Sequence, residues 1–296
     1  MSGVRSWDTL GEGERVVLAD RMHLFDPVRF ADATTSRAVC GGAGLERGAN
    51  HLSLWGPDGL RGSLGVVTRE VPVRGDAFVT SVCVEASERD AFDHLMRAAI
   101  GRVGDPAATI KLALSPLHPH LADFATAHGF AYREDALRLA LTGAAPPVAP
   151  HPGLVRAPVG ADEAETYRAI SNEAFRDAPN GGTMTSDEAR QRLEGRDFAD
   201  RVALYRVGEE VVGFHDVELQ GAVGMICSLG LLPRFQGRRL GPHLLHGCID
   251  TLRAHGAERV ELLVMSSNDR AVRLYRRYGF EQQAVLARWF VRLPGG

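Results

Sequence analysis

The chain has almost no lysine: of its 34 basic residues, Lys111 is the single lysine and the others are arginines. The 37 acidic residues bring the formal net charge to −3, so no basic field favours nucleic acid or an anionic membrane as a partner. Apolar runs fall short of the ~18 residues that span a bilayer, and the start of the chain lacks a basic segment followed by an apolar one. We therefore expect a cytoplasmic protein that binds neither nucleic acid nor membranes.

Cysteine is also scarce and is not arranged in CxxC pairs, which is typical of buried free thiols in a reducing compartment. The four cysteines are Cys40, Cys83, Cys227 and Cys248. Two histidine pairs, His118 with His120 and His243 with His246, lack a third ligand at a metal-like spacing. No G-x-S-x-G element occurs either. We therefore predict no metal site and no serine nucleophile.

The most informative segment is residues 228–256, SLGLLPRFQGRRLGPHLLHGCIDTLRAHG, in which an apolar strand leads through a turn into an amphipathic helix. Gly237 and Gly241 allow a ligand to approach the backbone closely, and the first amides of the helix have no partner within it. Arg238 and Arg239 add charged donors. This arrangement favours phosphate binding. The apolar stripe of the helix consists of Leu240, Leu244, Leu245, Cys248, Ile249 and Leu252, and Gly256 follows as a cap.

The order of segments around this turn resembles the GNAT superfamily of CoA-dependent N-acyltransferases. The hexapeptide Gln236-Gly-Arg-Arg-Leu-Gly241 corresponds to the family's Q/R-x-x-G-x-G/A turn. A strand at 259–265 follows, and residues 268–280 resemble the signature N-x-x-A-x-x-x-Y-x-x-x-G-F. The hexapeptide departs from the family pattern at Arg239, where the family has its middle glycine. A side chain at this position either crowds the pyrophosphate or contacts it.

The resemblance implies an α/β fold with a mixed (α+β) sheet and acetyl-CoA as co-substrate. It also implies that Tyr275 gives a proton to the departing thiolate, while the alternative is a core aromatic at helical spacing. A backbone amide at a bulge within 226–231 would polarise the thioester carbonyl. The implied cofactor-binding residues are Leu229, Leu231, Gln236, Gly237, Arg238, Arg239, Leu240, Gly241, Asn268, Ala271 and Tyr275.

The amine must be neutral when it attacks, and the strand at 211–219 offers His215 and Glu218 as candidate bases. Alternation along a strand places His215 on the opposite face from Asp216 and Glu218, so only one face can look into the site. A structural histidine is an equally good interpretation of His215. Water could instead take the proton, as the resemblance also implies.

The acceptor is expected near the loop at 175–183, between a helix around 162–175 and a second helix that starts at the capping box Thr185–Glu188. We expect a primary amine of a small molecule, with Phe175 and Asp177 as candidate contacts. The alternative for Asp177 is a simple turn former, because Asp, Pro, Asn and Gly all favour turns.

A second copy of the domain is predicted in the first half of the chain. The proline-rich stretch at 146–158 indicates a linker between domains at 1–145 and 159–296. Residues 110–130 align without gaps on 260–280, and two expected hairpin turns, 55–59 and 207–210, correspond. The chain is thus predicted to hold two GNAT-like domains in tandem.

The first copy lacks the features that favour phosphate in the second. Glu88 and Phe92 replace Gly237 and Gly241, and Ala125 replaces Tyr275. Acidic side chains at the turn would repel a phosphate, and they are Glu85, Glu88, Asp90 and Asp93. We therefore expect 1–145 to be a degenerate pseudo-domain and 159–296 to be the catalytic domain.

Two other classes of function remain open from the sequence. One is a non-catalytic protein that binds acyl-CoA or is structural, and the other is different acyl-CoA chemistry, such as another acyl donor or decarboxylation. The chain is expected to be a monomer or a homodimer, because the first copy could cover the open sheet edge that a dimer partner would otherwise cover.

Overall fold

The computed structural model describes residues 3–178, 181–194 and 198–295. It divides into two compact units. Unit 1 lies within Met1–Ala136 and Val285–Gly296, and unit 2 is Leu137–Ala284. Among the helices of the described ranges, none is both long and apolar enough to cross a membrane.

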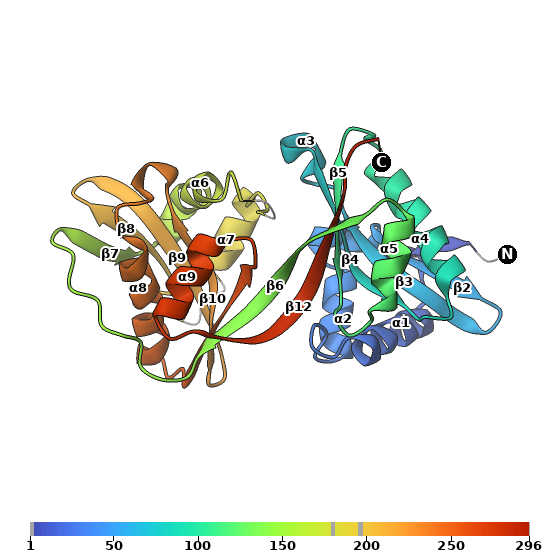
Figure 1. Ribbon diagram of the computed structural model, residues 1–296, viewed down its shortest axis with the longest axis horizontal. Coiled ribbons are helices and arrows are strands. Elements are labelled where there is room, and N and C mark those ends of the chain that lie inside the picture. Colours follow the sequence, from blue (N-terminus) through green and yellow to red (C-terminus); the bar gives the residue numbers. More distant parts are fainter. Residues whose placement is uncertain (1–2, 179–180, 195–197, 296) are drawn as a thin grey trace. The chain divides into compact units, whose positions relative to one another are not determined.

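Unit 1 has a mixed sheet in the order β1-β2-β3-β4-β5, with β12 next to β5 (Figure 1). Its elements are β1 (Val4–Ser6), η1 (Trp7–Thr9), α1 (Glu12–Phe25), α2 (Ala33–Cys40), η2 (Ala43–Gly48), β2 (His51–Gly56), β3 (Gly59–Val67), α3 (Val71–Arg74), β4 (Asp76–Val84), α4 (Arg89–Val103), β5 (Thr109–Leu114) and α5 (His120–Ala127). Two further strands, β6 (Ala131–Leu141) and β12 (Glu281–Arg292), are each divided between the units.

Unit 2 repeats this order, with a sheet β7-β8-β9-β10-β11 and β6 next to β11. Its elements are β7 (Leu154–Pro158), η3 (Ala161–Glu163), α6 (Ala164–Ala174), α7 (Ser186–Glu194), β8 (Val202–Val207), β9 (Glu210–Gln220), β10 (Val223–Leu231), η4 (Pro233–Phe235), α8 (Gly241–Ala254), β11 (Arg259–Met265) and α9 (Asp269–Arg277). The shared order of edge strand, two helices, hairpin, parallel pair and crossover helices shows two tandem copies of one mixed α/β fold.

The units do not follow the division at 146–158 that the prolines suggested. β7 lies within that stretch and pairs with β8 from Leu154↔Val207 to Pro158↔Ala203. Residues 285–296 belong to unit 1, where β12 pairs antiparallel with β5 from Arg288↔Leu114 to Arg292↔Ile110. β6 and β12 have 11 and 12 residues, so each is long enough to have one part in each unit.

Several local predictions are confirmed. The hairpins close at Gly56↔Gly59 and Val207↔Glu210, and the stripe of α8 is buried. The capping box of α7 is present, since the Glu188 amide donates to Thr185 Oγ1 at 3.2 Å and the Thr185 amide donates to Glu188 Oε2 at 2.9 Å.

The helices of unit 2 cover the two faces of its sheet, with α6 and α7 on one face and α8 and α9 on the other (Figure 1). Close packing of α6 depends on Gly230 in β10. A Cβ at this glycine would lie 2.7 Å from Phe214 and 2.9 Å from the Ala174 Cβ. Gly230 therefore allows the first helix to rest directly on the strand that leads into the turn.

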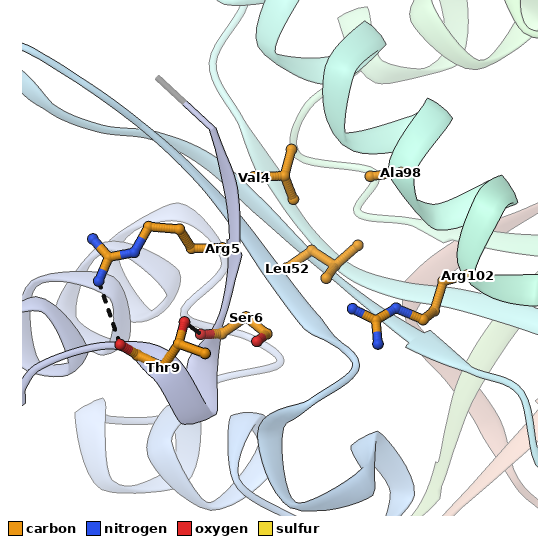
Figure 2. Close-up of a pocket in the computed structure, with 7 residues that line it drawn as sticks. All are labelled: Val4, Arg5, Ser6, Thr9, Leu52, Ala98 and Arg102. Atoms are coloured by element: carbon orange, nitrogen blue, oxygen red, sulfur yellow. Dashed lines mark hydrogen bonds between the residues drawn. The ribbon is translucent and has the colours of Figure 1, made fainter. Parts of the chain in front are cut away.

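A hollow recurs at the same place in each unit, between the edge strand and the helix that follows the turn. In unit 1 it measures about 360 Å³, and Figure 2 shows Arg102 of α4 reaching across it toward the edge strand. In unit 2 it measures about 340 Å³, and there Arg156 of β7 donates to the Gly247 carbonyl and the Thr251 hydroxyl, both at 2.7 Å. The arginine at the hollow thus comes from the helix in unit 1 and from the edge strand in unit 2.

Candidate active site

The strand β10 separates from its parallel neighbour partway along its length. β10 pairs antiparallel with β9 over its whole length, with a shift between Ile226 and Ser228 that makes Cys227 a bulge. Its parallel pairing with β11 ends at Ile226↔Leu262, although the strands continue to Leu231 and Met265. Beyond the bulge, the edge of β10 that faces β11 therefore has no parallel pairing with β11 among the described residues. Leu229 and Leu231, the predicted pantetheine contacts, lie in this stretch, and the predicted bulge is confirmed.

The φ angle is positive at two residues of the turn after β10. Gly237 and Arg239 have positive φ angles of 82° and 61°, and amides in such alternating conformations can converge on one point. A Cβ at Gly237 would meet nothing within 4 Å, whereas one at Gly241 would lie 3.3 Å from Leu274. Arg239 adopts the conformation that a glycine would adopt more easily, and its side chain is exposed, with the buried Leu240 beside it.

Basic and amide side chains surround this turn. Arg270 of α9 donates to Gln236 Oε1 at 3.2 Å, and Gln236 Nε2 donates to the Leu231 carbonyl at 3.4 Å. The Arg238 guanidinium lies 5.0 Å from the centre of the Phe235 ring. Gln236 thus ties the end of β10 to α9, and an arginine from α9 joins the two arginines of the turn.

The predicted residues of the C-terminal signature lie on α9. Asn268 is the N-cap, and its side chain accepts from the Ala271 amide at 3.2 Å. Tyr275 is 8% exposed and lies next to Phe280, with ring centres 5.9 Å apart. Burial, with a smaller effect of Cys248, raises the pKa of Tyr275 above its usual value. Tyr275 therefore holds its proton at neutral pH, as a proton donor requires.

His215 is buried, so an amine substrate that enters from solvent would not contact it directly. It is completely buried on the α8 face of β9, where Nε2 donates to the Asp200 carbonyl at 3.3 Å and Nδ1 lies 2.8 Å from the Tyr205 hydroxyl. Burial lowers its pKa to about 4. These contacts favour the structural interpretation of His215 over the role of general base.

The opposite face of β9 carries a cluster of ion pairs that sequence reasoning missed. Asp216 is 1% exposed and accepts from Tyr167 at 2.9 Å and from Arg192 at 2.5 Å. Glu218, two residues along, accepts from Arg201 at 3.1 Å and lies 3.5 Å from Arg192. Burial raises the pKa of Asp216 despite these arginines. An aspartate inside an apolar strand is a signal that could have revealed the cluster.

The pKa of Glu218 shifts in the opposite direction to that of Asp216. Burial opposes its charge, but the hydrogen bond from Gln220 and the positive charges of Arg201 and Arg192 outweigh burial and hold the pKa of Glu218 below its usual value. Its Oε2 also lies 3.8 Å from the thiol of Cys227 at the bulge. The carboxylate is thus beside the expected position of the thioester carbonyl.

The predicted acceptor loop begins directly after α6. The Phe175 ring packs edge-on against Phe214, with centres 6.0 Å apart, and Asp177 is exposed. Asn172 fastens the far side of the loop, because its side chain donates to the Met184 carbonyl at 3.0 Å and accepts from the Met184 amide at 2.8 Å. Residues 179–180 of this loop lie outside the described residues.

Unit 1 keeps the bulge but carries a different turn. Parallel pairing of β4 with β5 ends at Val79↔Leu112, and Ser81 at the β4 irregularity has a φ of 55°. The acidic side chains of its turn do not face a phosphate position as unpaired charges, because each has a basic partner. The pairs are Arg61 with Glu88 at 2.5 Å and with Asp90 at 2.7 Å, Arg21 with Glu85 at 3.3 Å, and His128 with Asp93 at 2.8 Å.

A histidine also meets the end of β4 in unit 1, and a second histidine lies beside it. His120 Nε2 lies 2.9 Å from the Val84 carbonyl, and Val84 pairs with Gly62 as Leu231 pairs with Gly213 in the other copy. His118 stacks on Phe25, with ring centres 3.5 Å apart. His120 therefore binds the carbonyl that corresponds to that of Leu231, which Gln236 binds in unit 2. Within the described residues, no His, Cys, Asp or Glu cluster suited to a metal ion occurs in either unit.

A split parallel pair, a bulge and an arginine-rich turn at a helix N-terminus occur together in unit 2, as the resemblance to CoA-dependent N-acyltransferases implies. The family model described as "Acetyltransferase (GNAT) family" matches residues 166–280. The chain belongs to the GNAT family of acetyltransferases, and it is an N-acetyltransferase by this membership.

Relatives and solved structures extend the similarity to both copies. A mycothiol acetyltransferase of Clavibacter michiganensis is 29% identical over 82% of this chain and 80% of its own length. Another, from Brachybacterium faecium, is 31% identical over 71% of this chain and 67% of its own length. The solved structure of a GCN5-related N-acetyltransferase from Sphaerobacter thermophilus is 20% identical, covers 99% of this chain and 95% of its own, and has a TM-score of 0.71. This likeness in structure shows the fold over the whole chain.

Proposed function

We propose that the chain transfers the acetyl group of acetyl-CoA to a primary amine of a small molecule by direct attack in a ternary complex, with the reaction centre in unit 2. One observation carries the proposal. β10 leaves the parallel ladder at the Cys227 bulge and leads directly into the turn Gln236–Gly241. Main-chain groups outside the parallel ladder and the arginine-rich turn therefore follow one another along a single stretch of chain, and a thioester with a phosphate-bearing tail could contact both.

Each part of the site has a separate task in this proposal. The main chain at 229–231 binds the pantetheine arm, and the turn amides with Arg238 and Arg239 hold the pyrophosphate. A backbone amide at the bulge polarises the thioester carbonyl. The amine nitrogen then bonds to the carbonyl carbon, the C–S bond breaks, and Tyr275 donates its proton to the sulfur. Water removes the proton of the amine, since His215 is buried.

The acceptor is proposed to enter on the α6–α7 face, where Phe175 and Asp177 border the loop and where Glu218 lies beside the bulge. The two relatives are named mycothiol acetyltransferases. Their name makes an unacetylated form of mycothiol the first amine to include in an assay. Unit 1 is proposed to be a copy without a cofactor, because Glu88 and Asp90 of its turn pair with Arg61 and because Glu88 stands where unit 2 has Gly237.

Calorimetric titration of acetyl-CoA into the intact chain tests the site. We expect one binding site per chain, lost in the double variant Arg238→Glu, Arg239→Glu. Arg97→Glu, on the exposed surface of α4, is the matched control and should bind as the wild type does. Thiol release with a panel of primary amines then tests the reaction. Two sites per chain, or binding that survives the double variant, would refute the placement of the cofactor.

A further inference from the structure

One row of side chains crosses the α6–α7 face of the unit 2 sheet beside the bulge. Met225 of β10 pairs with Glu218 of β9 and with Glu261 of β11. Residues that pair directly across a sheet point to the same face, so these three side chains lie side by side. Two positions beyond Glu261, Leu263 points to this face as well.

Leu263 is an unusual residue in its strand. It is 55% exposed, whereas its neighbours Leu262 and Val264 are 1% and 7% exposed on the other face. A single exposed leucine is common on protein surfaces. This one, however, follows the position at which β11 leaves β10, and the partly exposed Met225 and Met265 lie on the same face. They form an apolar wall next to the expected position of the thioester.

Glu218 is the accessible carboxylate of the neighbouring ion-pair cluster. Its side chain is 29% exposed, while that of Asp216 is 2% exposed. Arg201 and Arg192 approach its Oε2, whereas Oε1 accepts from the exposed amide of Gln220 at 3.2 Å. A carboxylate oxygen has two acceptor sites, so Oε1 has room for a further donor from the solvent side.

The charges around Glu218 fit a cationic ligand. Two arginines balance the two carboxylates Asp216 and Glu218, so the cluster carries no excess positive charge that would repel an ammonium group. The same arginines fix the Glu218 side chain from the buried side. Because Oε2 lies 3.8 Å from the Cys227 thiol, a donor bound to Glu218 would be close to the bulge.

We propose that Glu218 binds the ammonium group of the acceptor and that Leu263 and Met225 pack against the carbon skeleton next to that nitrogen. The acceptor class is then a primary amine with an apolar group near the nitrogen-bearing carbon. This inference rests on the proposed function. It makes Glu218 a binding residue, not the general base, and a carboxylate kept ionised by arginines suits that role.

The test compares the KM and kcat of two probes, hexylamine and ethanolamine, in an assay of thiol release from acetyl-CoA. We expect Glu218→Gln to raise the KM of both amines roughly 10- to 100-fold, as expected for one charged hydrogen bond, while kcat changes little. Leu263→Ser should raise the KM of hexylamine about fivefold and leave that of ethanolamine unchanged. Glu209→Gln, at the exposed hairpin turn, is the matched control.

A large fall in kcat at constant KM in Glu218→Gln would overturn the inference, since it would indicate a base. Calorimetric titration of hexylamine into CoA-saturated protein separates this inference from the proposed reaction. If wild-type protein binds hexylamine through Glu218 but releases no thiol with any amine, the reaction is wrong and the binding role stands. If hexylamine does not bind, or binds equally to Glu218→Gln, the binding role is wrong whether or not acetyl transfer occurs.

Discussion

Acid should destabilise unit 1 through one buried histidine. His51 begins β2 and is completely buried; its Nδ1 has no hydrogen-bond partner among the described residues, and Nε2 lies 3.6 Å from the Cys40 thiol. The edge of the Trp7 ring system packs against it, with ring centres 6.3 Å apart. Because no carboxylate stabilises the imidazolium, burial lowers the pKa of His51 to about 4.

The sign and size of the effect follow from proton linkage. Above pH 6.5 the histidine is neutral in both states and contributes nothing to the pH dependence. Between pH 6.5 and about 4 the unfolded chain binds the proton and the native unit does not, so the free energy of unfolding falls as the pH falls. At pH 5 this difference amounts to about 2 kcal/mol, and it approaches about 3 kcal/mol near pH 4.

Urea unfolding followed by tryptophan fluorescence at pH 7.5 and pH 5 measures this loss. Trp7, Trp55 and Trp289 all lie in unit 1, so the signal reports on that unit. His51→Gln should lose about 2 kcal/mol less than the wild type between the two pH values. His94→Gln, an exposed histidine of the same unit, should keep the wild-type dependence. An unchanged pH dependence in His51→Gln would refute the reasoning.

Three further outcomes are expected in unit 2. Tyr275→Phe should lower kcat roughly 100-fold, the scale of a general acid, with calorimetric acetyl-CoA affinity unchanged; wild-type turnover would exclude Tyr275 as the proton donor. Gly247→Ala should lower the free energy of unfolding by about 3 kcal/mol, because the new Cβ would lie 1.8 Å from the Tyr205 hydroxyl. Thermal unfolding would show this as a lower Tm, and an unaltered Tm would contradict it. Asn268→Ala should cost about 1 kcal/mol through loss of the α9 cap, measured by urea unfolding, and an unchanged midpoint would contradict this role of the side chain.

Local structure was largely predictable from the sequence because its signals are local. The stripe of α8, the Thr185 capping box and the hairpin turns each depend on residues a few positions apart. The division of β6 and β12 between the units was not predictable. A strand's sequence specifies its alternation and length, whereas its neighbour in the sheet depends on contacts between distant segments. The strand β7 was missed for a related reason, since prolines at 150, 152 and 158 concealed a short edge strand, where proline is tolerated.

The candidate site was predictable where a contiguous motif carries it. The turn Gln236–Gly241 and the helix start at Asn268 are such motifs: α8 begins at Gly241 and Asn268 caps α9, whereas their roles in binding stay predictions. The cluster around Asp216 was not, because Arg192 and Arg201 reach it from 24 and about 15 residues away. The same holds in unit 1, where Arg61 pairs with Glu88 over 27 residues. Sequence reasoning identified the charges of that turn and missed the partner that neutralises them.

The two copies share the bulge in the strand before the turn and differ in the residues of the turn itself. Unit 1 keeps the separation of β4 from β5 and holds Ser81, which is 2% exposed, at a φ of 55°. A left-handed conformation costs a non-glycine residue about 1 kcal/mol, yet this copy has no phosphate-binding glycines. The bulge therefore belongs to the sheet of this fold in both copies. A side chain also meets the strand-end carbonyl in both copies: His120 lies 2.9 Å from the Val84 carbonyl in unit 1, and Gln236, which accepts from Arg270, donates to the Leu231 carbonyl in unit 2. The copies differ instead in the turn that follows the strand, where Gly237 and Arg239 have positive φ angles in unit 2 and Glu88 and Asp90 pair with Arg61 in unit 1.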